Sequence, residues 1–122
     1  MIYYKELSDK IIGLAIEVHT NLGNGFLEKI YENALMIEFK TNHIAAKQQH
    51  AIPVQYKDTN VGEYYADILV DNKIVLELKT VKRIEPIHQA QLLHYLKATN
   101  LKLGYVLNFA SSPKIEFKRI IN

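Results

Sequence analysis

The sequence of 122 residues contains no cysteine and no tryptophan, and only five glycines and three prolines. The absence of cysteine excludes disulfide bonds, thiol catalysis and cysteine-based zinc fingers, although histidine-only zinc sites stay open. With 48% hydrophobic and 23% charged residues, the composition is that of a compact globular chain and not of a disordered or fibrous one. At this length we expect a single domain over residues 1–122.

Long hydrophobic runs are also missing. No apolar stretch approaches the roughly 20 residues that a membrane-spanning helix needs. The start of the chain, Met1 to Glu6, does not have the layout of a signal peptide. We therefore expect no membrane association and a cytoplasmic location.

The chain has no strong excess of charge of one sign, since its formal net charge is +2. Dedicated nucleic-acid binders often carry a larger basic excess, so the total charge does not identify one. The distribution is more informative, because basic residues gather over 79–83 and 114–119. These residues could form a basic surface beside an acidic pocket, or an ordinary solvated surface of mixed charge.

Hydrophobic periodicity predicts an α/β protein with a mixed sheet, in which the last helix connects two parallel strands as a right-handed crossover. Ser8 or Asp9 is the expected N-cap of the first helix, Gly23 its stop, and Pro86 belongs to the first turn of the third helix. The expected elements are helices over 7–22, 26–40 and 86–99, and strands over 51–56, 63–70, 73–81, 103–109 and 115–120.

Charged residues occur in the most hydrophobic of the predicted strands. Residues two apart in a strand share a face, so Glu77 and Lys79 point the same way. A tight turn at Asp71-Asn72 folds the preceding strand back and brings Asp67 alongside this pair. Two carboxylates and one ammonium group are therefore expected in one cluster.

Buried carboxylates cost several kcal/mol each unless they are paired, hydrogen-bonded or bound to a cation. Oxygen ligands suit a hard ion such as Mg²⁺ or Mn²⁺, which leaves coordination positions for water and substrate phosphate. The alternative is an ordinary cross-strand salt bridge on a solvated face of the sheet.

Further polar residues lie at helical spacing. Gln91 and Tyr95 share one face of the third helix, either as site residues or as boundary residues. Glu28 and Tyr31 share a face of the second helix, where the positive end of the helix dipole also explains the carboxylate of Glu28. His19 could ligate a metal or move protons, but a single histidine on an amphipathic helix is more often structural.

The segment from Gly25 to Tyr31 reads G-x-x-E-x-x-Y, and the chain resembles the GxxExxY family of the PD-(D/E)XK nuclease superfamily. The resemblance extends from Ile11 to Ile120. It includes Gly23-Asn24-Gly25, the Asp67 strand, Glu77-Leu78-Lys79, Gln91-Leu92-Leu93-His94-Tyr95 and Asn108-Phe109. It implies a restriction-endonuclease-like α-β-β-β-α-β core, a mixed central sheet flanked by helices, and an extra N-terminal helix.

The resemblance also implies roles for individual residues. Asp67 and Glu77 would bind a divalent metal, with Glu28 as a further acidic ligand. Lys79 would act on the attacking water or on the scissile phosphate. Gln91 and Tyr95 match a Q-x-x-x-Y helix motif that lies beside the active site in related enzymes. The superfamily's leading proline is absent, because Ala66 precedes Asp67.

We therefore expect an Mg²⁺- or Mn²⁺-dependent nuclease that hydrolyses phosphodiester bonds in nucleic acid, with DNA as the expected substrate. One alternative is a non-catalytic module that keeps the nuclease fold and binds nucleic acid or a protein partner. Another is an assembly protein whose first helix pairs two chains. A homodimer is also open, because a core of this size offers limited surface for gripping a duplex.

Overall fold

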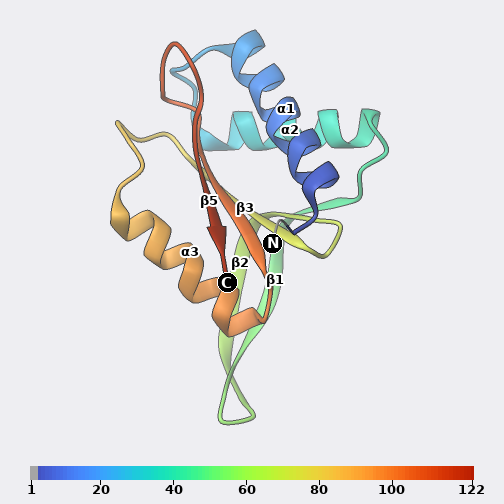
Figure 1. Cartoon of the computed structure of the whole chain (residues 1–122), viewed down its shortest axis with the longest axis vertical. Coiled ribbons are helices and arrows are strands. Elements are labelled where there is room, and N and C mark those ends of the chain that lie inside the picture. Colours follow the sequence, from blue (N-terminus) through green and yellow to red (C-terminus); the bar gives the residue numbers. More distant parts are fainter. Residues whose placement is uncertain (1–2) are drawn as a thin grey trace.

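The computed structural model describes residues 3–122, which form helices and strands in the expected order (Figure 1). None of the helices within these residues is long and apolar enough to cross a membrane. The elements are α1 (Lys5–Leu22), α2 (Glu28–Thr41), β1 (Ala46–Tyr56), β2 (Thr59–Val70), β3 (Ile74–Lys79), α3 (Pro86–Thr99), β4 (Leu103–Asn108) and β5 (Glu116–Ile121).

The five strands form one sheet in the order β1-β2-β3-β4-β5. β3 and β4 are parallel and are connected through α3, whereas the other neighbours are antiparallel. Helices α1 and α2 pack on one face of the sheet and α3 on the other (Figure 1). The structure therefore confirms the predicted α/β class, the mixed sheet and the additional N-terminal helix.

Alternation along β3 divides the core between the two faces. Leu76 and Leu78 are buried with α1 and α2, whereas Val75 is buried with α3. Because successive side chains of a strand point to opposite faces, Glu77 and Lys79 follow Val75 onto the α3 face. The predicted separation of the leucines from the charged pair is confirmed.

The turn between β2 and β3 forms where the sequence predicts it. Asp71 and Asn72 both have positive φ angles, of 52° and 55°, and the amide of Lys73 donates a hydrogen bond to the carbonyl of Val70 at 2.9 Å. Two central residues in this region are the signature of a type I′ hairpin turn, which asparagine and aspartate tolerate better than most residues.

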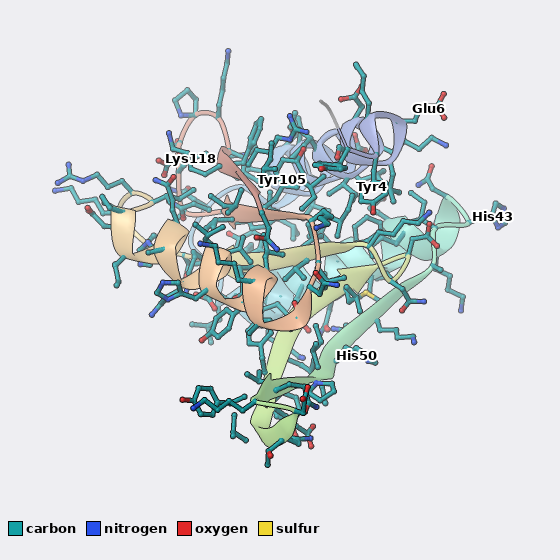
Figure 2. The ribbon with its side chains drawn as sticks, turned by 60° about the horizontal axis from the view of Figure 1, so that its bottom comes forward. Tyr4, Glu6, His43, His50, Tyr105 and Lys118 are labelled. Atoms are coloured by element: carbon teal, nitrogen blue, oxygen red, sulfur yellow. The ribbon has the colours of Figure 1, made fainter. Side chains whose placement is uncertain are left out.

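The first two strands are longer than predicted. β1 starts at Ala46 and β2 at Thr59, earlier than the predicted residues 51 and 63. The additional residues are mostly exposed on both faces, so they lack the apolar alternation by which a strand is identified in a sequence. Residues 59–62 lengthen the part of the hairpin that projects beyond the sheet (Figure 1), whereas residues 46–50 pair with the inner part of β2; His50, labelled in Figure 2, is the register partner of Ala66.

The predicted N-cap of α1 is wrong. The helix begins at Lys5, and Tyr4 is its N-cap residue without a side-chain hydrogen bond. Ser8 lies inside the first turn, and Asp9 forms an ion pair with Lys5 at 2.7 Å. Gly23, in contrast, ends the helix as predicted, with φ of 70° and its amide bonded to the carbonyl of His19.

Candidate functional site

The site is built around the end of β3, where β2 stops pairing with it. The ladder between the two strands covers Ile68 to Val70 on β2. Beyond it, the Asp67 side chain replaces a backbone partner, because its Oδ2 accepts a hydrogen bond from the amide of Leu78 at 2.8 Å. Asp67 is thereby held against the peptide between Glu77 and Lys79, as the predicted hairpin requires.

A bend in the β1–β2 hairpin also passes through Asp67. Gln49 on β1 has a φ of 46°, and it and Asp67 are skipped in the register of the two strands, which shifts again between Val54 and Gln55. Before this point Ala66 packs toward α3, and after it Ile68 packs toward α1 and α2. Such irregularities bend a strand and redirect its side chains. Asp67 therefore stands where β2 changes the face that it buries.

Glu77 has the most perturbed carboxyl group of the site. The residue is partly buried, and within residues 3–122 its Oε1 has no hydrogen-bond partner. Burial raises the pKa of Glu77 to about 7; Lys79 opposes the increase, and the carboxylates of Glu28 and Glu32 add to it. A group of this kind holds its charge near neutral pH only if a cation or a hydrogen-bond donor compensates it.

Glu28 reaches the same region from the first turn of α2. Its Oε2 accepts a hydrogen bond from the amide of Thr80, directly after β3, at 3.2 Å. The preceding loop is fixed by the buried Tyr31, whose hydroxyl donates to the carbonyl of Gly23 at 2.7 Å and accepts from the amide of Phe26 at 3.2 Å. The tyrosine of the G-x-x-E-x-x-Y segment thus fixes the loop that leads into Glu28, through bonds to Gly23 and Phe26.

Three residues that were not among the predicted site residues connect α2 to the site. Glu32 is almost fully buried and accepts hydrogen bonds from Gln48 at 2.7 Å and from Gln49 at 3.0 Å. The same Nε2 of Gln49 donates to Asp67 Oδ1 at 3.2 Å, so it bridges the two carboxylates. The spacing of Glu28 and Glu32, one helical turn apart, was the available signal. No pattern marked the glutamines, because the bend at Gln49 is a tertiary feature.

Four of the six predicted residues line one pocket of about 500 Å³ between β2, β3 and α3. They are Glu77, Lys79, Gln91 and Tyr95. Tyr95 also stacks on Tyr64, with ring centroids 3.7 Å apart and an interplanar angle of 13°. The other two, Asp67 and Glu28, are not among its lining residues and adjoin it through the amides that follow Glu77 and Lys79.

The residues present fit a hard divalent cation held partly by water and substrate. In the described part of the chain, no three His, Asp or Glu side chains converge as a ready-made metal site. Mg²⁺ is commonly bound through only one or two carboxylates together with waters and substrate phosphate. Oε1 of Glu77, together with the carboxylates of Asp67 and Glu28 that bind the nearby amides of Leu78 and Thr80, has the donor chemistry for such a partial ligand set.

His19 has the structural surroundings of a core residue. It is buried, its Nε2 donates a hydrogen bond to the carbonyl of Ser111 at 2.7 Å, and its ring lies 6.4 Å from that of Phe109. These contacts tie α1 to the loop before β5 and give the histidine a structural role.

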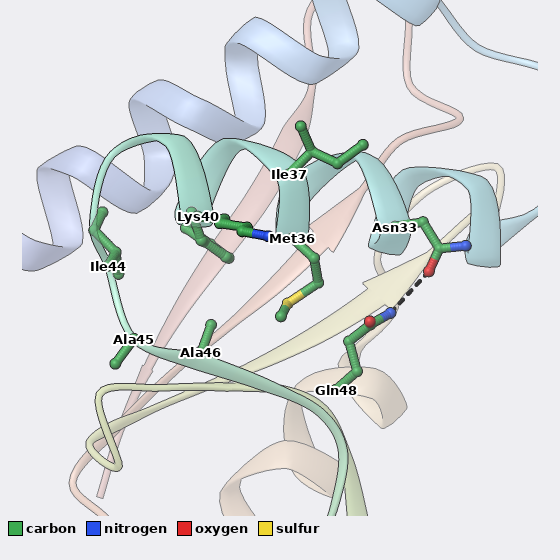
Figure 3. A pocket seen from close by; sticks show the side chains of 9 residues that line it. Asn33, Met36, Ile37, Lys40, Ile44, Ala45, Ala46 and Gln48 are labelled. Carbon is green, nitrogen blue, oxygen red and sulfur yellow. Dashed lines mark hydrogen bonds between the residues drawn. The ribbon is translucent and has the colours of Figure 1, made fainter.

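A larger hollow of about 580 Å³ lies elsewhere, between α2 and β1 (Figure 3). Its lining is mainly apolar, from residues such as Met36 and Ile37, and Gln48 closes one end through a 2.8 Å hydrogen bond to Asn33. None of the six predicted site residues lines it. The larger of the two cavities is therefore not the one lined by the predicted site residues.

Comparison with known proteins identifies the family. No curated protein is similar enough to the chain to be matched. The crystal structure of SSO0001 is similar with a TM-score of 0.57 and 21% sequence identity, over 78% of this chain and 50% of SSO0001. The chain thus spans half the length of that protein, and the likeness concerns the fold alone. The family model of the PD-(D/E)XK nuclease superfamily matches residues 5–120, and the chain belongs to this superfamily.

Proposed function

We propose that the chain is a divalent-metal-dependent nuclease that hydrolyses phosphodiester bonds, with DNA as its substrate. The observation that supports this proposal most strongly is Glu77: this carboxylate is partly buried, its Oε1 has no hydrogen-bond partner within residues 3–122, and it lines a pocket together with Lys79. Membership of a superfamily of nucleases supports the same reaction class.

Asp67, Glu77 and Glu28 are the proposed ligands of Mg²⁺ or Mn²⁺. When bound, such an ion polarises a phosphoryl oxygen and lowers the pKa of a coordinated water. Gln49 would keep Asp67 oriented through its bond to Oδ1, because this amide is itself anchored on the buried Glu32. Within residues 3–122, Oε1 of Glu77 is the buried carboxylate oxygen that is left without a hydrogen-bond partner.

Lys79, Gln91 and Tyr95 are the proposed residues that act on the substrate. The ammonium group of Lys79 would orient the attacking water or offset negative charge that develops on the phosphate. Gln91 and Tyr95 lie across the pocket from Glu77 on α3, which suits contacts to substrate or to the catalytic groups.

Four finer assignments belong to the same proposal. The G-x-x-E-x-x-Y segment and the contacts of Tyr31 support placement in the GxxExxY family. We further propose that residues 1–122 act as a single domain, that the protein works in the cytoplasm, and that it can form a homodimer.

A second candidate is a non-catalytic module that keeps the nuclease fold and binds nucleic acid or a protein partner. The observation in its favour is that no three acidic or histidine side chains converge in the described residues. This module would bind DNA in a salt-sensitive way, and its binding would survive the loss of the Glu77 carboxylate.

Cleavage assays with the Glu77→Gln variant distinguish the two candidates. The nuclease proposal expects Mg²⁺- or Mn²⁺-dependent cleavage by the wild type and a loss on the order of a hundredfold or more in the variant. Glu6→Gln on α1 is the matched control, because Glu6 is exposed and is not among the site residues; it should cleave as the wild type does.

Calorimetry supplies an independent measurement. Titration of Mg²⁺ or Mn²⁺ into wild type should give binding that disappears in the Asp67→Ala/Glu77→Ala double variant. The wild type can instead bind neither ion, even with DNA present, and cut no form of DNA or RNA. We would then conclude that the protein is a non-catalytic module.

A further inference from the structure

The pocket beside Glu77 has a free strand edge as one of its walls. β2 pairs with β3 only at Ile68 to Val70, whereas its earlier residues pair with β1 alone. Among residues 3–122, the edge that faces away from β1 therefore has no strand partner over residues 59–66, and residues 61–65 of this segment line the pocket. Backbone N–H and C=O groups on such an edge are available to a ligand.

Two polar atoms among the lining residues lack partners. Tyr64 is only 8% exposed, and within residues 3–122 neither its hydroxyl nor the Oε1 of Glu77 makes a hydrogen bond. A buried polar group without a hydrogen-bond partner destabilises the folded protein. A ligand whose binding lets these groups form hydrogen bonds would remove part of that destabilisation.

The two ends of the pocket differ in chemistry. Lys79 and Glu77 form a charged end on β3. The opposite end belongs to the hairpin, where Val54 is the register partner of Gly62 and Tyr64 follows on the same face of β2. Because Tyr64 stacks on Tyr95, this end combines an aromatic pair, an aliphatic side chain and backbone hydrogen-bonding groups.

A ligand that suits both ends is a flat heterocycle that carries an anionic group. The edges of the heterocycle would form hydrogen bonds at the hairpin end. The volume of about 500 Å³ lies within the range of about 300–1,000 Å³ that is usual for small-ligand pockets. The carboxylate of Glu63, also on the pocket wall, would repel a phosphate there but can accept a hydrogen bond from an exocyclic amino group. The hairpin end thus favours a nucleobase and the Lys79 end its phosphate.

We propose that this pocket binds an unpaired nucleobase, so that the enzyme acts on single-stranded segments or frayed ends and not within intact duplex. The inference rests on the proposed nuclease function for its biological meaning. A base inside a duplex is paired and stacked and reaches a protein pocket only after it is extruded. An unpaired strand pays no such cost and can place successive bases against aromatic side chains.

Fluorescence anisotropy without added metal, in the presence of a chelator, tests the inference apart from cleavage. The probes are a labelled single-stranded oligonucleotide, a hairpin duplex of the same sequence, and a single strand in which abasic sites replace the central nucleosides. We expect the wild type to prefer the single strand over the duplex. Abasic sites should weaken binding about tenfold, because one stacked base contributes about 1–3 kcal/mol.

Filling the pocket provides the test on the protein side. Val54→Trp places a large ring at the hairpin end and should lower affinity for the single strand about tenfold while leaving duplex affinity unchanged. Gln55→Trp adds the same side chain to the next, exposed residue, which does not line the pocket, and should bind as the wild type does. Circular dichroism of both variants checks that the fold is retained.

Equal affinity for duplex and single strand, or indifference to abasic sites, would overturn the inference, and neither result depends on a protein variant. The proposed function fails separately, if no substrate is cut although single-strand binding is sensitive to abasic sites and to Val54→Trp. Conversely, metal-dependent cleavage can be lost in Glu77→Gln while binding is unaffected by abasic sites. That result would support the proposed nuclease function and contradict the proposed base pocket.

Discussion

Glu77 shows how a single environment changes the behaviour of a carboxyl group. Its neighbours on the sheet are hydrophobic, and its Oε1 has no partner within residues 3–122. The ammonium of Lys79 compensates only part of the burial, and the acidic residues of α2 oppose ionisation further. Ionisation of Glu77 in this site is therefore unfavourable by itself. A cation bound to Oε1 would stabilise the charged form.

The pH dependence of stability should report this cost. Burial raises the pKa of Glu77 from 4.5 to about 7, so between these values the unfolded chain loses a proton that the folded chain retains. Stability from this residue is therefore greatest below pH 4.5 and falls until about pH 7, by roughly 3 kcal/mol at most. Urea unfolding in a chelator at pH 5 and pH 8 measures it. Glu77→Gln should remove most of the decrease, and an identical pH slope in both proteins would contradict the prediction.

Two tyrosine hydroxyls make a second comparison at the residue scale. Tyr31→Phe removes a hydroxyl that serves both Gly23 and Phe26, and should destabilise the protein by about 1–3 kcal/mol. Tyr64→Phe removes a buried hydroxyl without a partner in residues 3–122, and should leave stability unchanged or raised. Urea denaturation gives both values; an unchanged stability of the Tyr31→Phe variant would mean that the hydrogen bonds of Tyr31 contribute nothing.

At the scale of elements, the site depends on how closely α3 approaches the sheet. A side chain built at Gly104 on β4 would stand 3.0 Å from Leu92 Cδ2 and 3.1 Å from the carbonyl oxygen of Val75. The glycine thus permits the close contact of α3 with β3 and β4. Asn108 adds a polar connection, because its side chain bonds both the amide and the carbonyl of Val81 in the segment after β3.

Gly104→Ala should therefore destabilise the protein by about 1–3 kcal/mol, since neither the backbone oxygen nor the buried Leu92 can yield freely. Gly13→Ala on α1 is the matched control: nothing lies within 4 Å of its added methyl group, and alanine favours a helix by about 0.5–1 kcal/mol over glycine. Thermal and urea unfolding should move in opposite directions for the two variants. A shift in the same direction would argue against the close approach as the reason for Gly104.

For the whole molecule, the sheet has a rigid centre and a projecting hairpin. β4 is buried along its whole length between β3 and β5, whereas the outer ends of β1 and β2 are mostly exposed and pair with each other (Figure 1). Local opening is easiest where few buried contacts are lost. The outer part of the wall of the proposed base pocket, at Val61 and Gly62, therefore belongs to the part of the fold that opens most readily.

Amide hydrogen exchange should follow this division. Amides of β4, such as that of Val106, should exchange only with global unfolding, while those at the hairpin end near Tyr56 and Thr59 exchange through local fraying. NMR exchange rates in a chelator at several urea concentrations measure both. Equally slow exchange in the two regions would mean that the hairpin is as rigid as the centre.

The sequence by itself determined the order of elements, the Asp71-Asn72 turn and the separation of Glu77 and Lys79 from the buried leucines, because these depend on local periodicity and turn preferences. It could not reveal residues 46–50 and 59–62 of the two hairpin strands, because these residues are mostly exposed and carry no apolar pattern.

Only the tertiary structure decided which groups surround the site. The bend at Gln49 and Asp67, the burial of Glu32 and the stacking of Tyr64 on Tyr95 join residues from different elements. Local propensity does not encode such contacts, because each depends on how the helices and strands pack against one another.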